Sequence, residues 1–308
     1  MKLNRKLLGV FVALAFCLTT AFADDDKKAY LALGDSVAFG FNPTLFGPPP
    51  TPLPTPAQFI GYPEIVSKWT GLLDINPSCP GETSGSFLTF GAPDNGCNGM
   101  GPQGQPPFKT TIGLHTNYPG SQMQFALDQL RTDKSIKLVT LSIGGNDLSL
   151  LQAACAPTAN FVGCVTTGLP GVLGSYGANL DRILNSLRNE AKYHGQLIVV
   201  TNYSPSGNSV IVGAVFALNQ VAIAVGKKHK VGIADGFGAF QLISAPFGGD
   251  PCAAGLLIPL PVGYPGPPGA CDIHPSAKGR DLLAATVVLT LRNSSLSGGN
   301  DEGENDQH

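Results

Sequence analysis

Ser36 is the first residue whose type and setting indicate chemistry. It lies in residues 30–40 (YLALGDSVAFG), where an apolar run leads directly into Gly34, Asp35 and Ser36. The run predicts a buried strand, and ligands of open α/β sheets bind at the carboxyl ends of strands. A serine placed there acts as a nucleophile when a base takes its proton. The structural alternative is that Asp35 or Ser36 caps a helix.

His274 is the histidine best placed to be that base. It lies in residues 271–276 (CDIHPS), with the carboxylate of Asp272 two residues before it and Pro275 after it. Pro275 restrains the backbone where we expect the last helix to start. The other four histidines end predicted helices (His194, His229), lie in a loop (His115) or end the chain (His308).

Two further segments offer hydrogen-bond donors for an oxyanion. In residues 141–148 (LSIGGNDL) a strand pattern breaks at two glycines before Asn146, whose amide is a neutral donor. In residues 79–84 (CPGETS) Gly81 offers a backbone N–H with no side chain in the way. Losing such a donor costs roughly 100- to 1,000-fold in rate. The structural alternative for Asn146 is a turn asparagine beside a helix-capping Asp147. The structural alternative for Gly81 is a glycine turn held by a disulfide.

The elements that must position these residues alternate between short apolar runs and helical periodicity. This pattern predicts one α/β domain with a parallel sheet covered by helices. We expect strands at residues 29–33, 138–143, 197–201 and 231–234, and helices at 58–72, 122–131, 177–194, 210–228 and 276–292. Three long loops rich in glycine, proline or asparagine connect them, at residues 42–56, 92–119 and 258–269. The apolar face of the helix at 210–228 is interpreted as core.

Taken in order, the four segments resemble the SGNH (GDSL-type) hydrolases, a family of ester hydrolases. The resemblance runs from the first strand to the last helix. It implies a three-layer α/β/α sandwich with a central parallel sheet, as in flavodoxin-like folds, and no cofactor or metal. It also implies that Ser36 is the nucleophile, that His274 is the general base and acid, and that Ser36 N–H, Gly81 N–H and the Asn146 side chain form the oxyanion hole.

One segment departs from the family pattern. Family members usually place the acid three residues before the histidine, and that position here is Cys271. Either Asp272 reaches the imidazole by a different turn, or a backbone carbonyl near Cys271 orients it. Both arrangements fix the tautomer and stabilise the imidazolium. We expect Asp272 to be the orienting group, and its loss to cost less than the loss of His274.

Residues 1–23 are interpreted as a secretory signal peptide. Three basic residues precede an apolar run, and Ala21-Phe22-Ala23 is a small-residue cleavage site. The run is too short for a transmembrane helix, and the bulky Phe16 before Cys17 disfavours lipoprotein cleavage. We therefore expect a secreted protein with a hydrolase domain at 24–292 and a disordered acidic tail at 293–308.

Six cysteines remain in the mature chain, and an even number in an exported protein suggests disulfides. They form three close pairs along the chain, each spanning a loop rich in glycine and proline. We predict the pairings Cys79–Cys97, Cys155–Cys164 and Cys252–Cys271. A metal site is the alternative, but the sequence has no CxxC and no histidine at ligand spacing. Within the SGNH family that the chain resembles, a protein with three spaced disulfides is most similar to the actinobacterial-type secreted lipases and esterases.

Composition excludes several classes of protein. With 43% hydrophobic and 13% charged residues, the chain is neither disordered nor a charge-driven nucleic-acid binder. Without the signal it has 16 basic and 21 acidic residues, so we expect no nucleic-acid partner and no stable membrane insertion. GxSxG, phosphate-loop and HExxH motifs are absent, and Gly99, Gly101 and Gly104 have nucleotide-binding spacing only inside a proline-rich loop.

We therefore expect a secreted, monomeric lipase or esterase that acts on a small-molecule or lipid ester. The alternatives with the same site are a carbohydrate deacetylase, a phospholipid acyl hydrolase and an acyltransferase; a non-catalytic binding protein is the alternative from another class. The preference for acyl chains rests on apolar loop residues that are equally suited to loop packing. These residues are Phe39, Phe41, Leu45, Phe46, Leu256, Leu257, Ile258 and Leu260.

Overall fold

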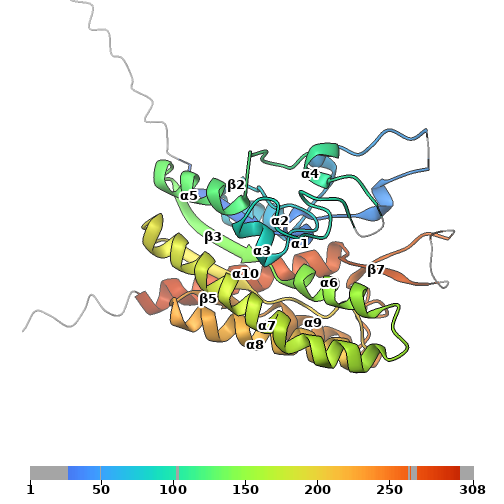
Figure 1. The fold of residues 1–308 in the computed structure, drawn as a ribbon. Coiled ribbons are helices and arrows are strands. Elements are labelled where there is room, and N and C mark those ends of the chain that lie inside the picture. The colour runs from blue at the N-terminus through green and yellow to red at the C-terminus, as the bar shows by residue number, and fades with distance from the viewer. Residues whose placement is uncertain (1–26, 49, 102–103, 263, 265–268, 299–308) are drawn as a thin grey trace, which may run out of the picture.

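The computed structural model describes residues 27–298 except 49, 102–103, 263 and 265–268. Its centre is a five-stranded sheet in which every pairing is parallel (Figure 1). The strand order is β2-β1-β3-β4-β5. The strands are β1 (Ala29–Gly34), β2 (Leu73–Ile75), β3 (Ile136–Ser142), β4 (Gln196–Val200) and β5 (Gly232–Ala234).

Helices cover both faces of the sheet, which confirms the predicted α/β/α sandwich. Alternate residues of a strand point to opposite faces, so Leu31 and Leu33 belong to one core and Tyr30 and Ala32 to the other. One face is covered by α3 (Ser84–Leu88), α5 (Gln122–Thr132), α6 (Gly145–Cys155), α7 (Phe161–Asn185) and α8 (Ser209–Lys228). The other is covered by α1 (Ser36–Phe39), α2 (Tyr62–Thr70), α9 (Gly236–Ser244) and α10 (Ala277–Gly298).

The remaining elements are short. α4 (Phe108–Thr111) lies in the loop before α5, and an antiparallel pair, β6 (Leu257–Pro259) and β7 (Cys271–Pro275), precedes α10. Three turns of 3₁₀ helix and one π turn complete the secondary structure: Pro43–Leu45, Pro56–Gln58, Ala245–Phe247 and Ser186–Glu190.

All four predicted strands are present, with ends shifted by about two residues, as is usual for boundaries read from sequence. β2 was missed, because its three residues follow α2 directly and carry no apolar run: Leu73 is exposed. The first 16 residues of α7 were also missed, since glycines and Pro170 disfavour a helix there. Burial of Tyr176 in the core, with Leu169, Val172 and Leu173 packed against it, outweighs that local preference.

The start and end of the last helix differ from the prediction. Pro275 ends β7 rather than starting α10, and the Ser276 hydroxyl caps the helix by accepting a hydrogen bond from Gly279 N–H at 3.3 Å. The helix continues to Gly298, six residues beyond the expected end. The predicted signal peptide at 1–23 and the acidic residues at 301–306 lie outside the described residues.

The structure contains the three disulfides Cys79–Cys97, Cys155–Cys164 and Cys252–Cys271, the same pairs that proximity along the chain suggested. Closing loops of 10–20 residues restricts the unfolded chain, an effect worth about 3 kcal/mol each in the loop-entropy view. Cys79–Cys97 closes the segment that carries Gly81, and Cys252–Cys271 ends at the residue before Asp272.

α8 is the one helix in the described part of the chain that is long and apolar enough to cross a membrane. Its inner side, including Ala214, Leu218 and Ala222, is buried in the core that it shares with α7. This packing agrees with its interpretation as a core helix of the sandwich.

Gly34 supplies a stability prediction. Its φ is +148°, and a Cβ there would lie 2.2 Å from the backbone oxygen of Ser142. Gly34→Ala is therefore expected to lower the free energy of unfolding by about 2 kcal/mol or more, measured by urea denaturation of the oxidised protein. Gly171→Ala is the control, because that helical position is open, and it is expected to raise stability by about 0.5–1 kcal/mol. Equal effects of the two substitutions would contradict the role of the turn.

Candidate active site

Ser36 lies where β1 turns into the short helix α1, at the carboxyl edge of the sheet. Asp35 caps this helix, since its side chain accepts a hydrogen bond from Val37 N–H at 3.0 Å. The Ser36 N–H is at the first helical position and has no partner within the helix. Asp35 is therefore a helix cap, as the structural alternative proposed. Ser36 is half-buried, and its hydroxyl faces His274.

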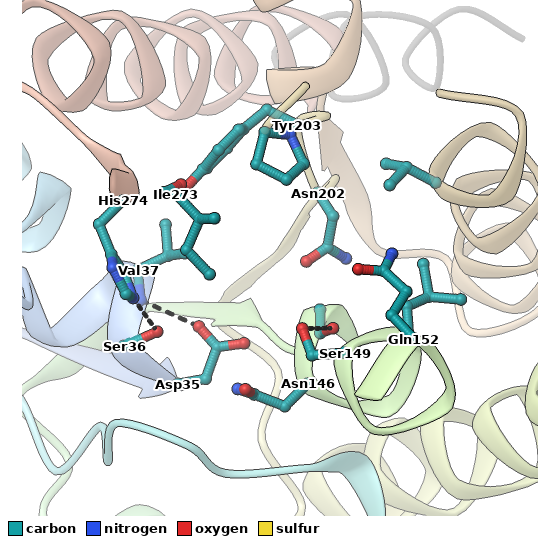
Figure 2. Close-up of a pocket in the computed structure, with 14 residues that line it drawn as sticks. Asp35, Ser36, Val37, Asn146, Ser149, Gln152, Asn202, Tyr203, Ile273 and His274 are labelled. Carbon is teal, nitrogen blue, oxygen red and sulfur yellow. Dashed lines mark hydrogen bonds between the residues drawn. The ribbon is translucent and has the colours of Figure 1, made fainter. Parts of the chain in front are cut away.

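His274 connects Ser36 to Asp272. Figure 2 shows the hydrogen bond between His274 and Ser36. Its Nε2 lies 2.8 Å from Ser36 Oγ, and its Nδ1 lies 2.5 Å from Asp272 Oδ1. A carboxylate only accepts hydrogen bonds, so Nδ1 carries the proton and Nε2 is free to accept from the serine. Burial raises the pKa of Asp272, but the hydrogen bond and charge of His274 outweigh it and hold this pKa below its usual value.

The two-residue spacing of Asp272 and His274 follows from the strand β7. Residues i and i+2 of a strand point to the same side, so the Asp272 carboxylate lies beside the His274 imidazole without a special turn. Asp272 Oδ1 also accepts a hydrogen bond from His274 N–H at 3.0 Å. Between them, Ile273 O accepts from the Tyr203 hydroxyl at 2.7 Å, which fixes the strand to the loop after β4. The carboxylate of Asp272, rather than a carbonyl near Cys271, is thus the partner of Nδ1.

Asn146 and Gly81 line the same large cavity as Ser36. Asn146 Nδ2 donates one hydrogen bond to Glu82 O at 3.0 Å, which leaves its second N–H for a ligand. Gly81 has a φ of +87°, and among the described residues none accepts a hydrogen bond from its N–H. Three N–H groups, including that of Ser36, therefore remain available at one wall of the cavity.

Asn95 is a functional candidate that sequence reasoning missed. Its Nδ2 donates to Asn146 Oδ1 at 2.9 Å, and its backbone N–H donates to Gly81 O at 2.8 Å. Because Glu82 O can only accept, the amide nitrogen of Asn146 must face it, and Asn95 holds the oxygen on the other side. The one available signal was its position within the loop closed by Cys79–Cys97.

A buried glutamine holds the end of β1. Gln122 Oε1 accepts from Gly34 N–H at 2.7 Å, and its Nε2 donates to Gly34 O at 2.9 Å and to Glu82 Oε2 at 2.8 Å. Burial raises the pKa of Glu82 to about 7, although the Gln122 hydrogen bond opposes the shift. This network connects the turn that carries Ser36 to the chain segment that carries Gly81.

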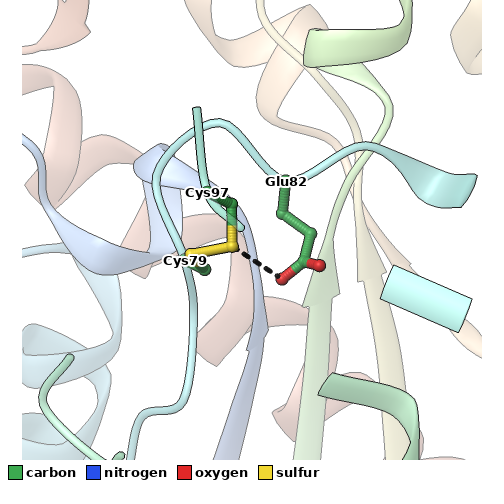
Figure 3. A group of neighbouring side chains, drawn as sticks. All are labelled: Cys79, Glu82 and Cys97. Atoms are coloured by element: carbon green, nitrogen blue, oxygen red, sulfur yellow. Dashed lines mark hydrogen bonds between the residues drawn. A yellow bond between two sulfur atoms is a disulfide. The ribbon is translucent and has the colours of Figure 1, made fainter. Parts of the chain in front are cut away.

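Glu82 also lies against the disulfide Cys79–Cys97 (Figure 3). One ligand-type atom of each residue lies within 4.8 Å of the others, a spacing suited to a metal ion. The two sulfurs are bonded to each other, however, and a disulfide offers no thiolate to a metal. We therefore interpret this cluster as the structural base of the loop.

Asp35 adds a second titratable carboxyl next to Ser36. It is 2% exposed, and burial raises its pKa to about 7, against the opposing effects of the Val37 hydrogen bond and the His274 charge. Its side chain borders the smaller of two cavities at Ser36. The carboxyl nearest to Ser36 in the sequence is therefore a helix cap, whereas Asp272 is the one bonded to the imidazole.

Two cavities meet at Ser36 and His274. The larger, about 580 Å³, is lined mainly by apolar side chains, and the smaller, about 100 Å³, has several polar side chains in its wall (Figure 2). Of the eight apolar loop residues singled out from sequence, Phe41 and Phe46 line the large cavity. The Phe41 ring lies 4.8 Å from the His274 ring. Two others are buried in separate hydrophobic clusters instead: Phe39 packs with Phe59, and Leu256 packs with residues of α9 and α10.

The fold is an α/β/α sandwich in which Ser36, Asn146 and His274 converge at one sheet edge, an arrangement suited to hydrolysis through an activated serine. The chain belongs to the GDSL-like Lipase/Acylhydrolase family, whose family model matches residues 32–282. This match confirms the resemblance drawn from the four sequence segments. Among curated protein sequences, none matches the chain significantly.

Solved structures share this fold at low sequence identity. Phospholipase A1 from Streptomyces albidoflavus NA297 is 20% identical with a TM-score of 0.54, over 86% of this chain and 99% of that one. An extracellular lipase from Streptomyces rimosus is 16% identical with a TM-score of 0.51, over 85% and 99%. A variant of an acetylxylan esterase from Geobacillus stearothermophilus is 16% identical with a TM-score of 0.51, over 86% and 94%.

Asn95 supplies a prediction about the donor Asn146. Asn95→Leu removes the group that orients the Asn146 amide, so we expect kcat for ester hydrolysis to fall roughly 10- to 100-fold with KM little changed. This loss is smaller than the loss expected when the donor itself is removed. In an Asn146→Ala background the same substitution is expected to have no further effect, because Asn95 acts through Asn146.

The matched control is Asn98→Ala, in the same loop but without a contact to Asn146. Steady-state kinetics of the four variants and the wild type complete the cycle. Additive losses for Asn95→Leu and Asn146→Ala would contradict the positioning role of Asn95.

Proposed function

We propose that this protein is a secreted serine ester hydrolase, a lipase or esterase that cleaves esters of apolar acyl groups. The observation that carries the proposal is the line from Asp272 through His274 to Ser36, at the mouth of an apolar cavity whose wall offers free N–H donors. Each part is a requirement of acyl transfer through an activated serine.

In the acylation step, His274 Nε2 takes the proton of Ser36 as its Oγ attacks the ester carbonyl. Negative charge develops on the carbonyl oxygen, which accepts hydrogen bonds from Ser36 N–H, Gly81 N–H and Asn146 Nδ2. Asp272 stabilises the imidazolium and holds Nδ1 protonated. The C–O bond to the alcohol then breaks, and His274 returns the proton to the leaving oxygen.

Deacylation repeats these steps with water as the nucleophile. His274 takes a proton from water, the hydroxide attacks the acyl carbon, and the same three donors stabilise the second oxyanion. Collapse of this intermediate releases the acid and restores the Ser36 hydroxyl. No cofactor or metal enters the proposed mechanism.

The large cavity supports an apolar acyl group as the substrate's acid part. Its volume of about 580 Å³ falls in the range of small-molecule sites, and its lining is mainly apolar. The apolar side chains come from three separate segments of the chain: Phe41, Phe46, Leu53, Phe108, Ile112 and Ile273. Two of them belong to the proline-rich segment 42–56, so we assign part of that segment to substrate binding.

Export and a monomeric state complete the proposal. The signal-like start of the sequence and three disulfides support an oxidising destination outside the cytoplasm. All residues of the proposed site come from one chain, so a monomer would suffice for activity.

The first test is labelling with a fluorophosphonate probe, which reacts only with an activated serine. Wild-type protein is expected to be labelled, and Ser36→Ala and His274→Ala are expected to lose labelling. Both variants are also expected to lose hydrolysis by roughly 10³-fold or more, as in other sites that use a serine and a histidine. Asp272→Ala is expected to lose less, since the imidazole remains. A folded, oxidised wild type that is neither labelled nor active on esters would instead favour a non-catalytic binding protein.

The second test concerns the acyl cavity. Ile112→Trp fills part of the cavity, so we expect kcat/KM for the dodecanoyl ester of p-nitrophenol to fall about tenfold or more, while the acetyl ester changes little. Thr110→Trp is the control, because Thr110 is exposed and does not line the cavity. Equal losses for both esters would contradict the assignment of this cavity to the acyl chain.

A further inference from the structure

The smaller cavity adjoins the acyl cavity at Ser36 and His274 and differs from it in size and in the share of polar side chains in its wall. Its volume of about 100 Å³ corresponds to about three water-sized groups. Ser36, Asn146, Ile273 and His274 line both cavities, so the two meet at the reacting atoms. A group bound in the small cavity is therefore within reach of His274.

Side chains of α6 and of the loop after β4 give the small cavity its polar character. Figure 2 shows the amides of Gln152 and Asn202 facing one another across it, with Ser149 beside them. Among the described residues, none forms a hydrogen bond with the side-chain amide of Gln152. Asn202 Nδ2 donates to Ile143 O at 3.2 Å, which leaves its Oδ1 as an acceptor. Ser149 Oγ donates to Gly145 O at 3.0 Å and keeps its lone pairs.

These groups match a ligand that carries hydroxyls. A hydroxyl both donates and accepts, so it can satisfy the Gln152 amide and the Asn202 oxygen, which an alkyl group would leave unpaired. The volume suits two or three carbon atoms with their hydroxyls. A long apolar acyl chain does not fit this volume and would leave the polar groups of Gln152 and Asn202 unpaired, and it has the larger cavity available.

We propose that the small cavity is the alcohol subsite, and that it selects esters of short polyhydric alcohols, such as glycerol, that keep free hydroxyls. The inference rests on the proposed esterase function and specifies its substrate. With the acyl chain in the large cavity, the ester oxygen faces His274 Nε2 and the alcohol extends toward Gln152 and Asn202. When the C–O bond breaks, the His274 proton passes to the alkoxide oxygen and the polyol leaves through this cavity.

The test compares two soluble esters that differ only in hydroxyl groups. Glycerol monobutyrate and propyl butyrate carry the same acid and a three-carbon alcohol. Wild type is expected to have a kcat/KM at least about tenfold higher for glycerol monobutyrate, as expected from one or two additional hydrogen bonds. Gln152→Leu is expected to lower that value about tenfold and to leave propyl butyrate within about twofold.

The control variant is Gln124→Leu on α5, whose amide bonds to Asp128 and does not line either cavity. It is expected to leave both values unchanged. Hydrolysis of both esters without a preference, or an equal loss for both in Gln152→Leu, would overturn the polyol subsite and leave the esterase intact. A wild type that hydrolyses neither ester and does not react with a fluorophosphonate would overturn the esterase function itself.

Discussion

The turn at the end of β1 is the constraint on which the rest of the site depends. The backbone of Gly34 leaves the sheet with a φ of +148°, and both its N–H and its C=O are hydrogen-bonded by the amide of Gln122. This pairing completes the hydrogen bonding of the strand end and holds Ser36 at the carboxyl edge. Because β3 is the neighbour of β1, Asn146 reaches the same edge from the start of α6. Displacing this turn would move Ser36 relative to both Asn146 and His274.

The segment closed by Cys79–Cys97 acts as a second rigid part of the site. It carries Gly81, whose N–H is a proposed oxyanion donor, and Asn95, which orients the other donor. Glu82, in the same segment, accepts a hydrogen bond from Asn146 at its backbone oxygen and one from Gln122 at its side chain. The disulfide therefore stabilises the chain and also limits the relative movement of groups that must converge on one oxygen atom. Preorganised donors of this kind need little reorganisation during reaction.

Strand geometry explains how this chain orients its histidine with a two-residue spacing. In β7 the side chains of Asp272 and His274 share one side of the strand, and the hydroxyl of Tyr203 holds the residue between them. The Cys252–Cys271 disulfide lies at the start of the same strand. The two cavities that flank this strand differ in polarity, and this difference is what separates the acid part of the proposed substrate from its alcohol part.

The amino-acid sequence by itself determined the fold class, four of the five strands of the central sheet, the helices with clear periodicity and the residues that converge at the sheet edge. Strands buried on both faces require continuous apolar runs, and catalysis of this type requires a serine, a histidine and neutral donors, so both leave local signals. Only the tertiary structure decided the partners of those residues. Ser36 and His274 are 238 positions apart and Asn95 and Asn146 are 51 apart, and their contacts depend on loop paths. The start of α7 and the two cavities likewise arise from packing between distant segments, which local propensity does not encode.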